Sequence, residues 1–375
     1  MIAKEDFWKT INDVHSNIAM NSIESIRKLS KVIPSIAFQM LPDKLYQYRL
    51  FSSDSDSFDS CSYNVKHLIN DEIWGTKISR ENDQYEIFPY FGIQEMNKLL
   101  QEGINLQEDF ASITEDKAKK SFPIIGNMMG DDGYRLFVEF CKDKSILPLL
   151  SELVELSKKS VEKIDRDYIL QGVRTRLAGT YLACFTENDF STLMEAHYSK
   201  GSTGFVVEYD SQDLIQQCDK IDECDMRLGC RTGGLSVPLY PVDYTNERID
   251  LSNIIAVSMF YIFTSMCVRG EVETLGWEYL DYLADLKIVC WKKKEWEYEK
   301  EWRMISFSLP GFNDGPDYIP LKKAKASSVS VFERTSSGNL EFMKGICIQK
   351  GIPLYLLKED INSKICNTFI RDRII

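Results

Sequence analysis

Histidine is scarce in this sequence, with only His15, His67 and His197 among 375 residues. A hydrolytic triad needs a histidine that a carboxylate orients toward a nucleophile, and the Gly-x-Ser-x-Gly turn of many hydrolases is also missing. The sequence therefore argues against triad catalysis. His197, just before Gly201 and Gly204, fits either a ligand-binding role or a histidine at a helix end.

Cysteines at the spacing of a metal site are lacking as well. The ten cysteines include no Cys-x-x-Cys pair, and Cys218, Cys224 and Cys230 recur every six residues, unlike the short loops that close a tetrahedral zinc site. Others lie in apolar runs, as Cys184 and Cys290 do. We interpret them as reduced core residues of a cytoplasmic protein and expect no metal there.

No apolar run is long enough for a bilayer. The most apolar stretch, residues 254–268, has 15 residues and includes Ser258, Thr264 and Ser265, which favours a buried helix. The N-terminus carries acidic residues and no early apolar stretch, so we expect no secretory signal. A membrane partner is not expected.

Positive charge is in deficit, since the net charge is −12. The summed field repels nucleic acid and anionic membranes at long range, so nucleic acid would bind only through a local patch. Two short lysine runs are candidates, residues 292–294 and 322–325, and we interpret both as solvated surface.

The residues that are present suffice for a folded core, with 44% hydrophobic and 12% aromatic residues. Helical periodicity over residues 5–33 predicts a helical N-terminal segment, residues 1–42. Residues 43–375 are predicted to form one α+β domain around a mixed, largely antiparallel sheet, with a helical insertion at about 94–178. We expect strands at residues 44–50, 73–79, 181–186, 203–209, 239–244, 299–307, 327–333 and 353–357. We expect further helices at residues 65–73, 189–198, 210–220, 251–268, 277–289 and 340–349.

Glu299 and Glu301 form the most informative pair. On the predicted strand, side chains two residues apart share a face, so both carboxylates point one way while Trp302 and Met304 pack behind. Two close carboxylates raise one pKa or need a bound hydroxyl or cation, which suits a sugar-binding or nucleophile-activating site. The alternative is a solvated charged strand with Arg303 as a neighbour.

Polar side chains also stand at the ends of two other predicted strands. Tyr48 and Arg49 end the first, where the guanidinium fits a phosphate, a carboxylate or a structural salt bridge. Thr186 ends a middle strand, where its hydroxyl either joins a site or caps the helix predicted from Asp189.

Four blocks resemble a widespread bacterial family of uncharacterised proteins. They are Leu45-Tyr-Gln-Tyr-Arg49, Ile73-Trp-Gly-Thr-Lys-Ile-Ser-Arg-Glu-Asn-Asp83, Ala183-Cys-Phe-Thr-Glu187 with Leu193-Met-Glu-Ala-His-Tyr-Ser-Lys-Gly-Ser-Thr-Gly-Phe205, and Trp296-Glu-Tyr-Glu-Lys-Glu-Trp-Arg303. Their order is also similar to the Arg-Ser-Glu layout of ADP-ribosyltransferases, which have a basic residue on the first strand, a hydroxyl residue on a middle strand and Glu-x-Glu near the end.

This resemblance implies an ADP-ribosyltransferase-like sheet and NAD as the substrate. Glu301 would bind the ribose hydroxyl and stabilise positive charge at the sugar, and Glu299 would orient the acceptor. Arg49 would hold the pyrophosphate and Thr186 would brace the site. The remaining expected cofactor-binding residues are Tyr48, His197 and Tyr198, of which either tyrosine would stack on nicotinamide.

Three functional hypotheses follow. The first is an NAD-consuming glycosyl transfer enzyme, an ADP-ribosyltransferase or NAD glycohydrolase, acting as a toxin or anti-phage effector on a macromolecular acceptor or on NAD itself. The second is a non-catalytic module that binds a nucleotide or a regulatory protein. The third is a nuclease in which Asp83, Glu299 and Glu301 bind magnesium.

Overall fold

The computed structural model describes a set of separate ranges. These are residues 6–11, 33–34, 36–51, 63–80, 89–90, 114–121, 131, 134–135, 138–139, 142, 171, 173–174, 177–199, 201, 203–215, 239–250, 285–306, 315–364 and 369–375.

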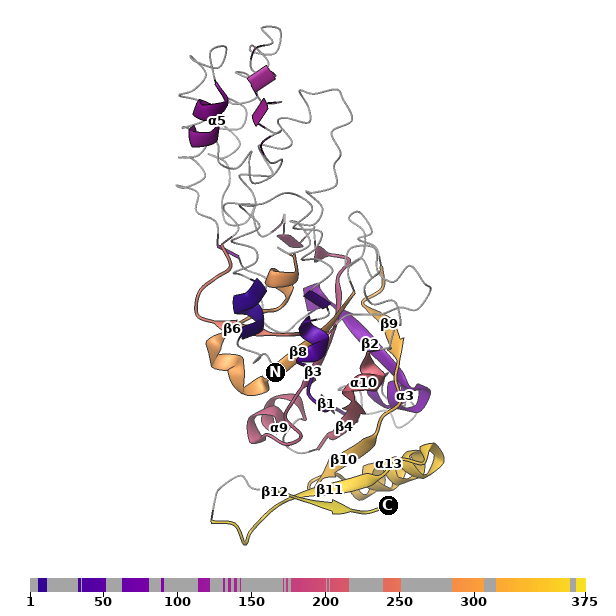
Figure 1. Cartoon of the computed structure of the whole chain (residues 1–375). Coiled ribbons are helices and arrows are strands. Elements are labelled where there is room, and N and C mark those ends of the chain that lie inside the picture. Colours follow the sequence, from indigo (N-terminus) through magenta and orange to yellow (C-terminus); the bar gives the residue numbers. More distant parts are fainter. Residues whose placement is uncertain are drawn as a thin grey trace.

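A ten-stranded mixed sheet dominates the described part of the chain (Figure 1). Its strands are β1 (Lys44–Arg49), β2 (Glu72–Lys77), β3 (Tyr181–Thr186), β4 (Phe205–Asp210), β5 (Leu239–Pro241), β8 (Glu301–Ser306), β9 (Tyr318–Lys323), β10 (Ser328–Phe332), β11 (Leu354–Glu359) and β12 (Phe369–Arg373). The main path runs β12-β11-β10-β4-β1-β3-β2-β9, and β8 joins β3 and β5. All pairs are antiparallel except β10 with β11, which confirms the predicted mixed, largely antiparallel sheet.

Strand β3 is the branch point that creates space for a site. One of its edges pairs with β8 along the whole strand, from Tyr181 to Thr186. Its other edge pairs with β1 only at Thr186 and with β2 only at Tyr181 and Leu182, so β1 and β2 diverge between these points. The Gln47 side chain spans the divergence, and its Nε2 donates to the Cys184 carbonyl at 3.0 Å.

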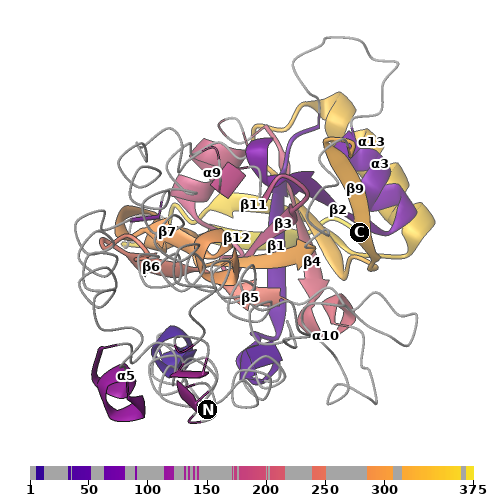
Figure 2. The same ribbon diagram turned by 90° about the horizontal axis from the view of Figure 1, so that it is seen from above.

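Strand alternation sorts the apolar side chains onto the two sheet faces. Phe205, Val207 and Tyr209 of β4 share one cluster with side chains of α3 (Tyr63–Asn70), α10 (Ser211–Leu214) and α13 (Ser337–Lys350). Val206, between them, packs instead with Met194 of α9 (Thr192–Tyr198). Figure 2, seen from above, shows α3 and α13 close together and α9 on the other side of β3.

The N-terminal helical prediction is confirmed at residues 6–11, 33–34 and 36–39. Phe7 and Ile11 are fully buried in a cluster with residues of β3 and β8, and the Trp8 Nε1 donates to the Pro241 carbonyl at 3.1 Å. This first helix therefore docks on the body of the protein. Within the predicted insertion, α5 (Glu115–Ser121) is helical, and most of the remaining residues lie outside the described ranges.

Most predicted strands are confirmed within one or two residues, but two predicted strands differ and three strands were not predicted. The stretch predicted as 239–244 breaks at Val242 into β5 and β6 (Asp243–Thr245), which pairs in parallel with β7 (Trp291–Lys293). Strands β7, β9 and β12 were not predicted. Of the helices predicted at 251–268 and 277–289, only residues 285–289 are described, and they are helical.

For the site, the most important correction concerns the strand predicted at residues 299–307, which begins later than predicted. Residues Lys294–Glu299 form the 3₁₀ helix η5, and β8 begins only at Glu301. Lys300 lies between them in the left-handed conformation, with φ 44° and ψ 48°, which a strand residue does not adopt. Trp302 and Met304 are fully buried behind Glu301, as predicted.

Candidate functional site

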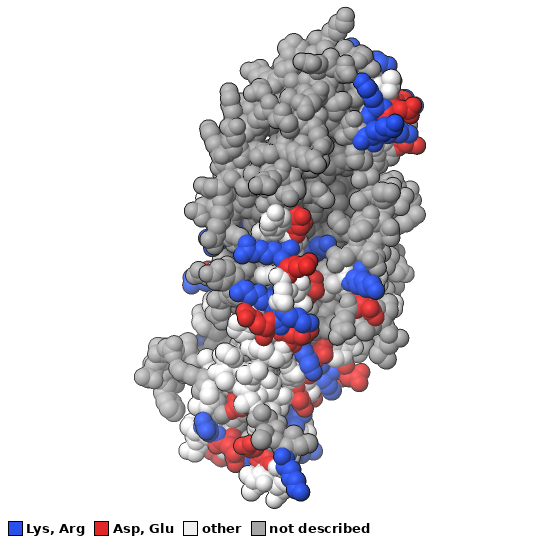
Figure 3. Space-filling view, turned by 90° about the vertical axis from the view of Figure 1, so that its left-hand side faces the viewer, with Lys and Arg blue, Asp and Glu red and all other residues white. Residues whose placement is uncertain are grey.

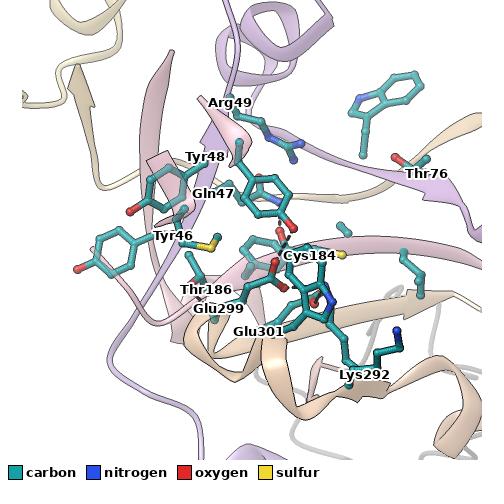
Figure 4. A pocket seen from close by; sticks show the side chains of 18 of the residues that line it. Tyr46, Gln47, Tyr48, Arg49, Thr76, Cys184, Thr186, Lys292, Glu299 and Glu301 are labelled. Atoms are coloured by element: carbon teal, nitrogen blue, oxygen red, sulfur yellow. Dashed lines mark hydrogen bonds and ion pairs between the residues drawn. The ribbon is translucent and has the colours of Figure 1, made fainter. Parts of the chain in front are cut away.

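A pocket of about 490 Å³ opens where β1 and β2 diverge from β3 (Figure 4). This volume is in the range of small-molecule sites. Its wall takes residues from β1, β2, β3, α9, β7, η5 and β8, namely Tyr46, Gln47, Tyr48, Arg49, Trp74, Thr76, Leu182, Ala183, Cys184, Phe185, Thr186, Met194, Tyr198, Lys292, Lys293, Glu295, Trp296, Glu299 and Glu301. Segments more than 200 residues apart in the sequence therefore meet at one cavity.

Glu299 and Glu301 converge even though they do not share a strand. Lys292 joins them, because its Nζ lies 2.6 Å from Glu299 Oε2 and 3.0 Å from Glu301 Oε2. Glu299 is 2% exposed, Glu301 5% and Lys292 6%, so this ion pair lies inside the protein. The left-handed turn at Lys300 brings the two carboxylates to one ammonium.

Arg303 supplies the second cation of this cluster. Its Nε and Nη2 donate to the two carboxylate oxygens of Glu301 at 2.8 and 3.2 Å, and its Nη1 donates to the Val289 carbonyl. Arg303 is 2% exposed. The alternative of a solvated charged strand is therefore wrong, and two buried carboxylates are balanced by two buried cations.

Hydroxyl groups brace the turn between η5 and β8. Tyr198 donates to Glu299 Oε1 at 2.5 Å, and the Glu301 N–H donates to the Tyr244 hydroxyl at 2.8 Å. Thr186 Oγ1 donates to the Glu299 carbonyl at 2.5 Å and accepts from the Asn188 N–H at 3.0 Å. These bonds fix the backbone on both sides of Lys300.

The two carboxylates have different proton affinities. Burial raises the pKa of Glu299, Lys292 opposes this and the neighbouring Glu301 adds to it, with a raised pKa as the result. Burial also acts to raise the pKa of Glu301, but the charges of Arg303 and Lys292 outweigh it and hold that pKa well below its ordinary value. Glu301 is thus a fixed anion, and Glu299 is the carboxylate better suited to take up a proton.

Arg49 lies across the pocket from the carboxylates. It ends β1, pairs with Phe205 of β4 and lines the same cavity as Glu299 and Glu301 (Figure 4). Its backbone touches Gly204, where an added Cβ would lie 2.3 Å from the Arg49 carbonyl oxygen. Only glycine allows the two strands to approach this closely.

The other predicted residues fall into two groups. Tyr48, Thr186 and Tyr198 line the pocket, and the Tyr48 ring also packs against Phe332 at 6.4 Å between centroids. His197 is exposed on α9, outside the pocket lining, with Trp296 5.9 Å away between ring centroids. Thr186 does not cap α9, because Ser191 does so.

Lys292 is the site residue that the sequence analysis missed, since the prediction that residues 292–294 are solvated surface is wrong for it. Lys293 and Lys294 fit that prediction better, with side chains 43% and 51% exposed. Its position in the sequence indicates the burial of Lys292, because it directly follows the apolar run from Ile288 to Trp291, which continues into β7.

The described residues hold no group of three or more His, Cys, Asp or Glu side chains that could bind a metal ion. The ammonium of Lys292 lies between Glu299 and Glu301, where a bridging cation would otherwise be placed. Asp83, which the nuclease hypothesis also needs, lies outside the described residues.

The surface charges of the described part show no extended basic region on the face in Figure 3, where Lys and Arg alternate with Asp and Glu.

Among the helices of the described residues, none has the length and apolar character needed to cross a membrane.

Comparison with known proteins gives one match. Residues 194–304 match a family model described as a protein of unknown function (DUF2971). No curated protein and no solved structure matches the chain. The matched region holds Tyr198, Lys292, Glu299, Glu301 and the first four of the six residues of β8, whereas Arg49 and Thr186 precede it.

Proposed function

We propose that this protein binds NAD in the pocket between β1 and β8 and cleaves its nicotinamide–ribose bond, transferring ADP-ribose to a macromolecular acceptor or to water. The observation that carries the proposal is that Arg49, from the first strand, and Glu299 and Glu301, from the last third of the chain, line one cavity. A guanidinium opposite two carboxylates suits a ligand with phosphates at one end and a sugar at the other.

Each side chain has a role that follows from its position. Arg49 binds the pyrophosphate, and the aromatic wall around Tyr198 and Trp296 accepts the nicotinamide ring. The fixed anion of Glu301 accepts a hydrogen bond from a ribose hydroxyl and stabilises positive charge at the anomeric carbon.

The reaction needs NAD and one nucleophile, either water or an acceptor side chain. The bond between C1′ and the nicotinamide nitrogen breaks, and its electron pair leaves with nicotinamide, which becomes neutral. The oxocarbenium-like ribose is then attacked by water or by an acceptor side chain, whose proton passes to Glu299. Because Glu299 has a raised pKa, it is suited to hold that proton.

Nicotinamide release from NAD by the full chain tests the proposal, with Glu299→Gln as the key variant. We expect at least about a 10²-fold loss of rate, since the variant lacks the proton acceptor. Glu297→Gln is the matched control, because Glu297 stands on the same helix η5, its carboxylate pairs with the exposed Lys294, and it does not line the pocket. Its rate should equal that of the wild type.

Thermal unfolding of both variants accompanies the assay, so that misfolding is not counted as lost chemistry. No nicotinamide release by the wild type, or equal rates for wild type and Glu299→Gln, would reject the proposal. Retained NAD binding without release would instead support the second candidate, a nucleotide-binding module. The observation favouring that candidate is that both carboxylates already have cationic partners.

A further inference from the structure

The two cations that balance the carboxylates differ in their freedom to move. The Arg303 guanidinium bonds to Glu301 through two nitrogens and to the Val289 carbonyl through a third, and Arg303 does not line the pocket. Lys292 does line it, and its ammonium sits at the end of a flexible four-carbon stem. Lys292 is therefore the cation that a ligand entering the pocket can replace.

The contacts of Lys292 indicate the chemistry of a replacement. Its Nζ donates to one oxygen of Glu299 and to one oxygen of Glu301, and thus satisfies two acceptors from a single point. A ligand that removes the ammonium must supply two donors side by side, or it leaves buried carboxylate oxygens unsatisfied. Two adjacent hydroxyl groups on a sugar ring meet this requirement.

We propose that Lys292 is an exchangeable counter-ion, which holds Glu299 and Glu301 in the empty pocket and leaves them when a vicinal diol binds there. The identity of that diol as the nicotinamide ribose rests on the proposed function. Trp296 offers the displaced ammonium a nearby position, since Nζ already lies 5.3 Å from the centroid of its ring.

The exchange changes the charge of the site at the moment of binding. With Lys292 in place, two carboxylates face two cations; once it leaves, Arg303 still pairs with Glu301, and Glu299 loses the ammonium that it shared. An excess of negative charge then stands beside the sugar, where positive charge develops in glycosidic bond cleavage. Lys292 thus acts as a positioning residue that keeps the empty site neutral.

Ligand titrations of the full chain test this inference with probes that the enzyme cannot cleave. Ribose 5-phosphate carries the vicinal diol, and 2-deoxyribose 5-phosphate lacks it. In Lys292→Met the diol no longer has to displace a cation, so we expect ribose 5-phosphate to bind at least about fivefold more tightly than to the wild type, by NMR titration. The deoxy sugar should show no such gain.

Lys294→Met is the matched control, because Lys294 belongs to the same lysine run, pairs with the exposed Glu297 and lies outside the pocket lining. Its affinity for ribose 5-phosphate should equal that of the wild type. Unchanged or weaker binding of the diol sugar by folded Lys292→Met would overturn the inference, as would an equal gain for both sugars.

Lys292→Arg keeps the charge and covers the case in which Lys292→Met does not fold. A guanidinium binds carboxylates through two parallel hydrogen bonds, so we expect it to leave less readily and to weaken ribose 5-phosphate binding several-fold. Unchanged affinity in this variant would also count against exchange.

These titrations are independent of NAD turnover. If the protein shows the exchange but releases no nicotinamide, the counter-ion mechanism stands and the proposed reaction is rejected. If it releases nicotinamide but Lys292 has no effect on sugar binding, the proposed reaction stands and the counter-ion mechanism is rejected. Absence of sugar binding in the wild type and in all variants overturns the exchange.

Discussion

At the scale of single residues, the site depends on charges that are buried only because each has a partner. Arg303 and Glu301 are 2% and 5% exposed and share two hydrogen bonds. Removing one member of such a pair leaves the other uncompensated, which typically costs about 3–5 kcal/mol. Substitution of Glu301 itself is therefore a poor test of catalysis, and Glu299, which shares Lys292 with it, is the better choice.

Thr186 gives a prediction about the bracing of the turn. Thr186→Val keeps the shape but removes the hydroxyl that donates to the Glu299 carbonyl and accepts from the Asn188 N–H. We expect a loss of about 1–3 kcal/mol in the free energy of unfolding, measured by urea denaturation. Thr186→Ser keeps the hydroxyl and should lose less. A smaller loss in Thr186→Val than in Thr186→Ser would show that the methyl group, and not the hydroxyl, matters.

His67 gives a prediction about pH. Burial and the nearby Arg49 lower its pKa to about 4 from an ordinary 6.5. Between these values the unfolded chain binds a proton that the folded protein does not, so stability falls as the pH drops from 6.5 to 4 and is unaffected by this group above 6.5.

The ring of His67 stacks on Trp74 at 4.7 Å and 6°, so Phe can replace it without losing the packing. His67→Phe should flatten the dependence of the unfolding free energy on pH in this window, as measured by denaturation from pH 4 to 7.5. An unchanged slope would mean that His67 protonates equally in both states.

At the scale of elements, the close approach of β1 and β4 sets the position of Arg49. Gly204→Ala would place a Cβ 2.3 Å from the Arg49 carbonyl oxygen, so the strand ends must separate. We expect lower thermal stability and weaker NAD binding. Gly345→Ala is the matched control, because this exposed position in α13 has open space and alanine favours a helix by about 0.5–1 kcal/mol. Destabilisation by both changes would contradict this account.

Period-two patterns predicted the strands well where a chain segment is buried on one or both faces. β1, β3 and β10 match their predicted ranges closely, because their apolar residues and their length leave little choice. β12 was missed because Phe369–Arg373 is an exposed edge strand with charged residues, and such strands have little pattern to read.

The prediction that Glu299 and Glu301 lie close together is based on an assumption that is only partly right, namely that both residues belong to one strand. Glu stands at every second position from Glu295 to Glu301, which predicts a strand, but the first part of this stretch forms η5. Local sequence does not reveal the left-handed Lys300, which tertiary hydrogen bonds hold in place, among them the Glu187 N–H to the Lys300 carbonyl at 3.3 Å. The convergence on Lys292 needed the structure for the same reason.

At the scale of the whole molecule, long-range topology assembles the pocket. Three antiparallel neighbours of β3 come from residues 44–49, 72–77 and 301–306, and the DUF2971 match covers only the last of these, up to residue 304. The proposed reaction thus requires residues from inside and outside the matched region. The whole chain has a net charge of −12, so the balance of charges in the cluster at Lys292 is a local feature and does not reflect the charge of the protein as a whole.

Cys184 provides a direct readout of the pocket. It is partly exposed and lines the cavity, so a ligand in the pocket shields its thiol from alkylation. The most direct measurement mixes the full chain with NAD and iodoacetamide, then follows alkylation of the Cys184 peptide by mass spectrometry and free nicotinamide by chromatography. We predict that NAD slows alkylation of Cys184 while nicotinamide accumulates. Alkylation at an unchanged rate with no nicotinamide formed would contradict the account.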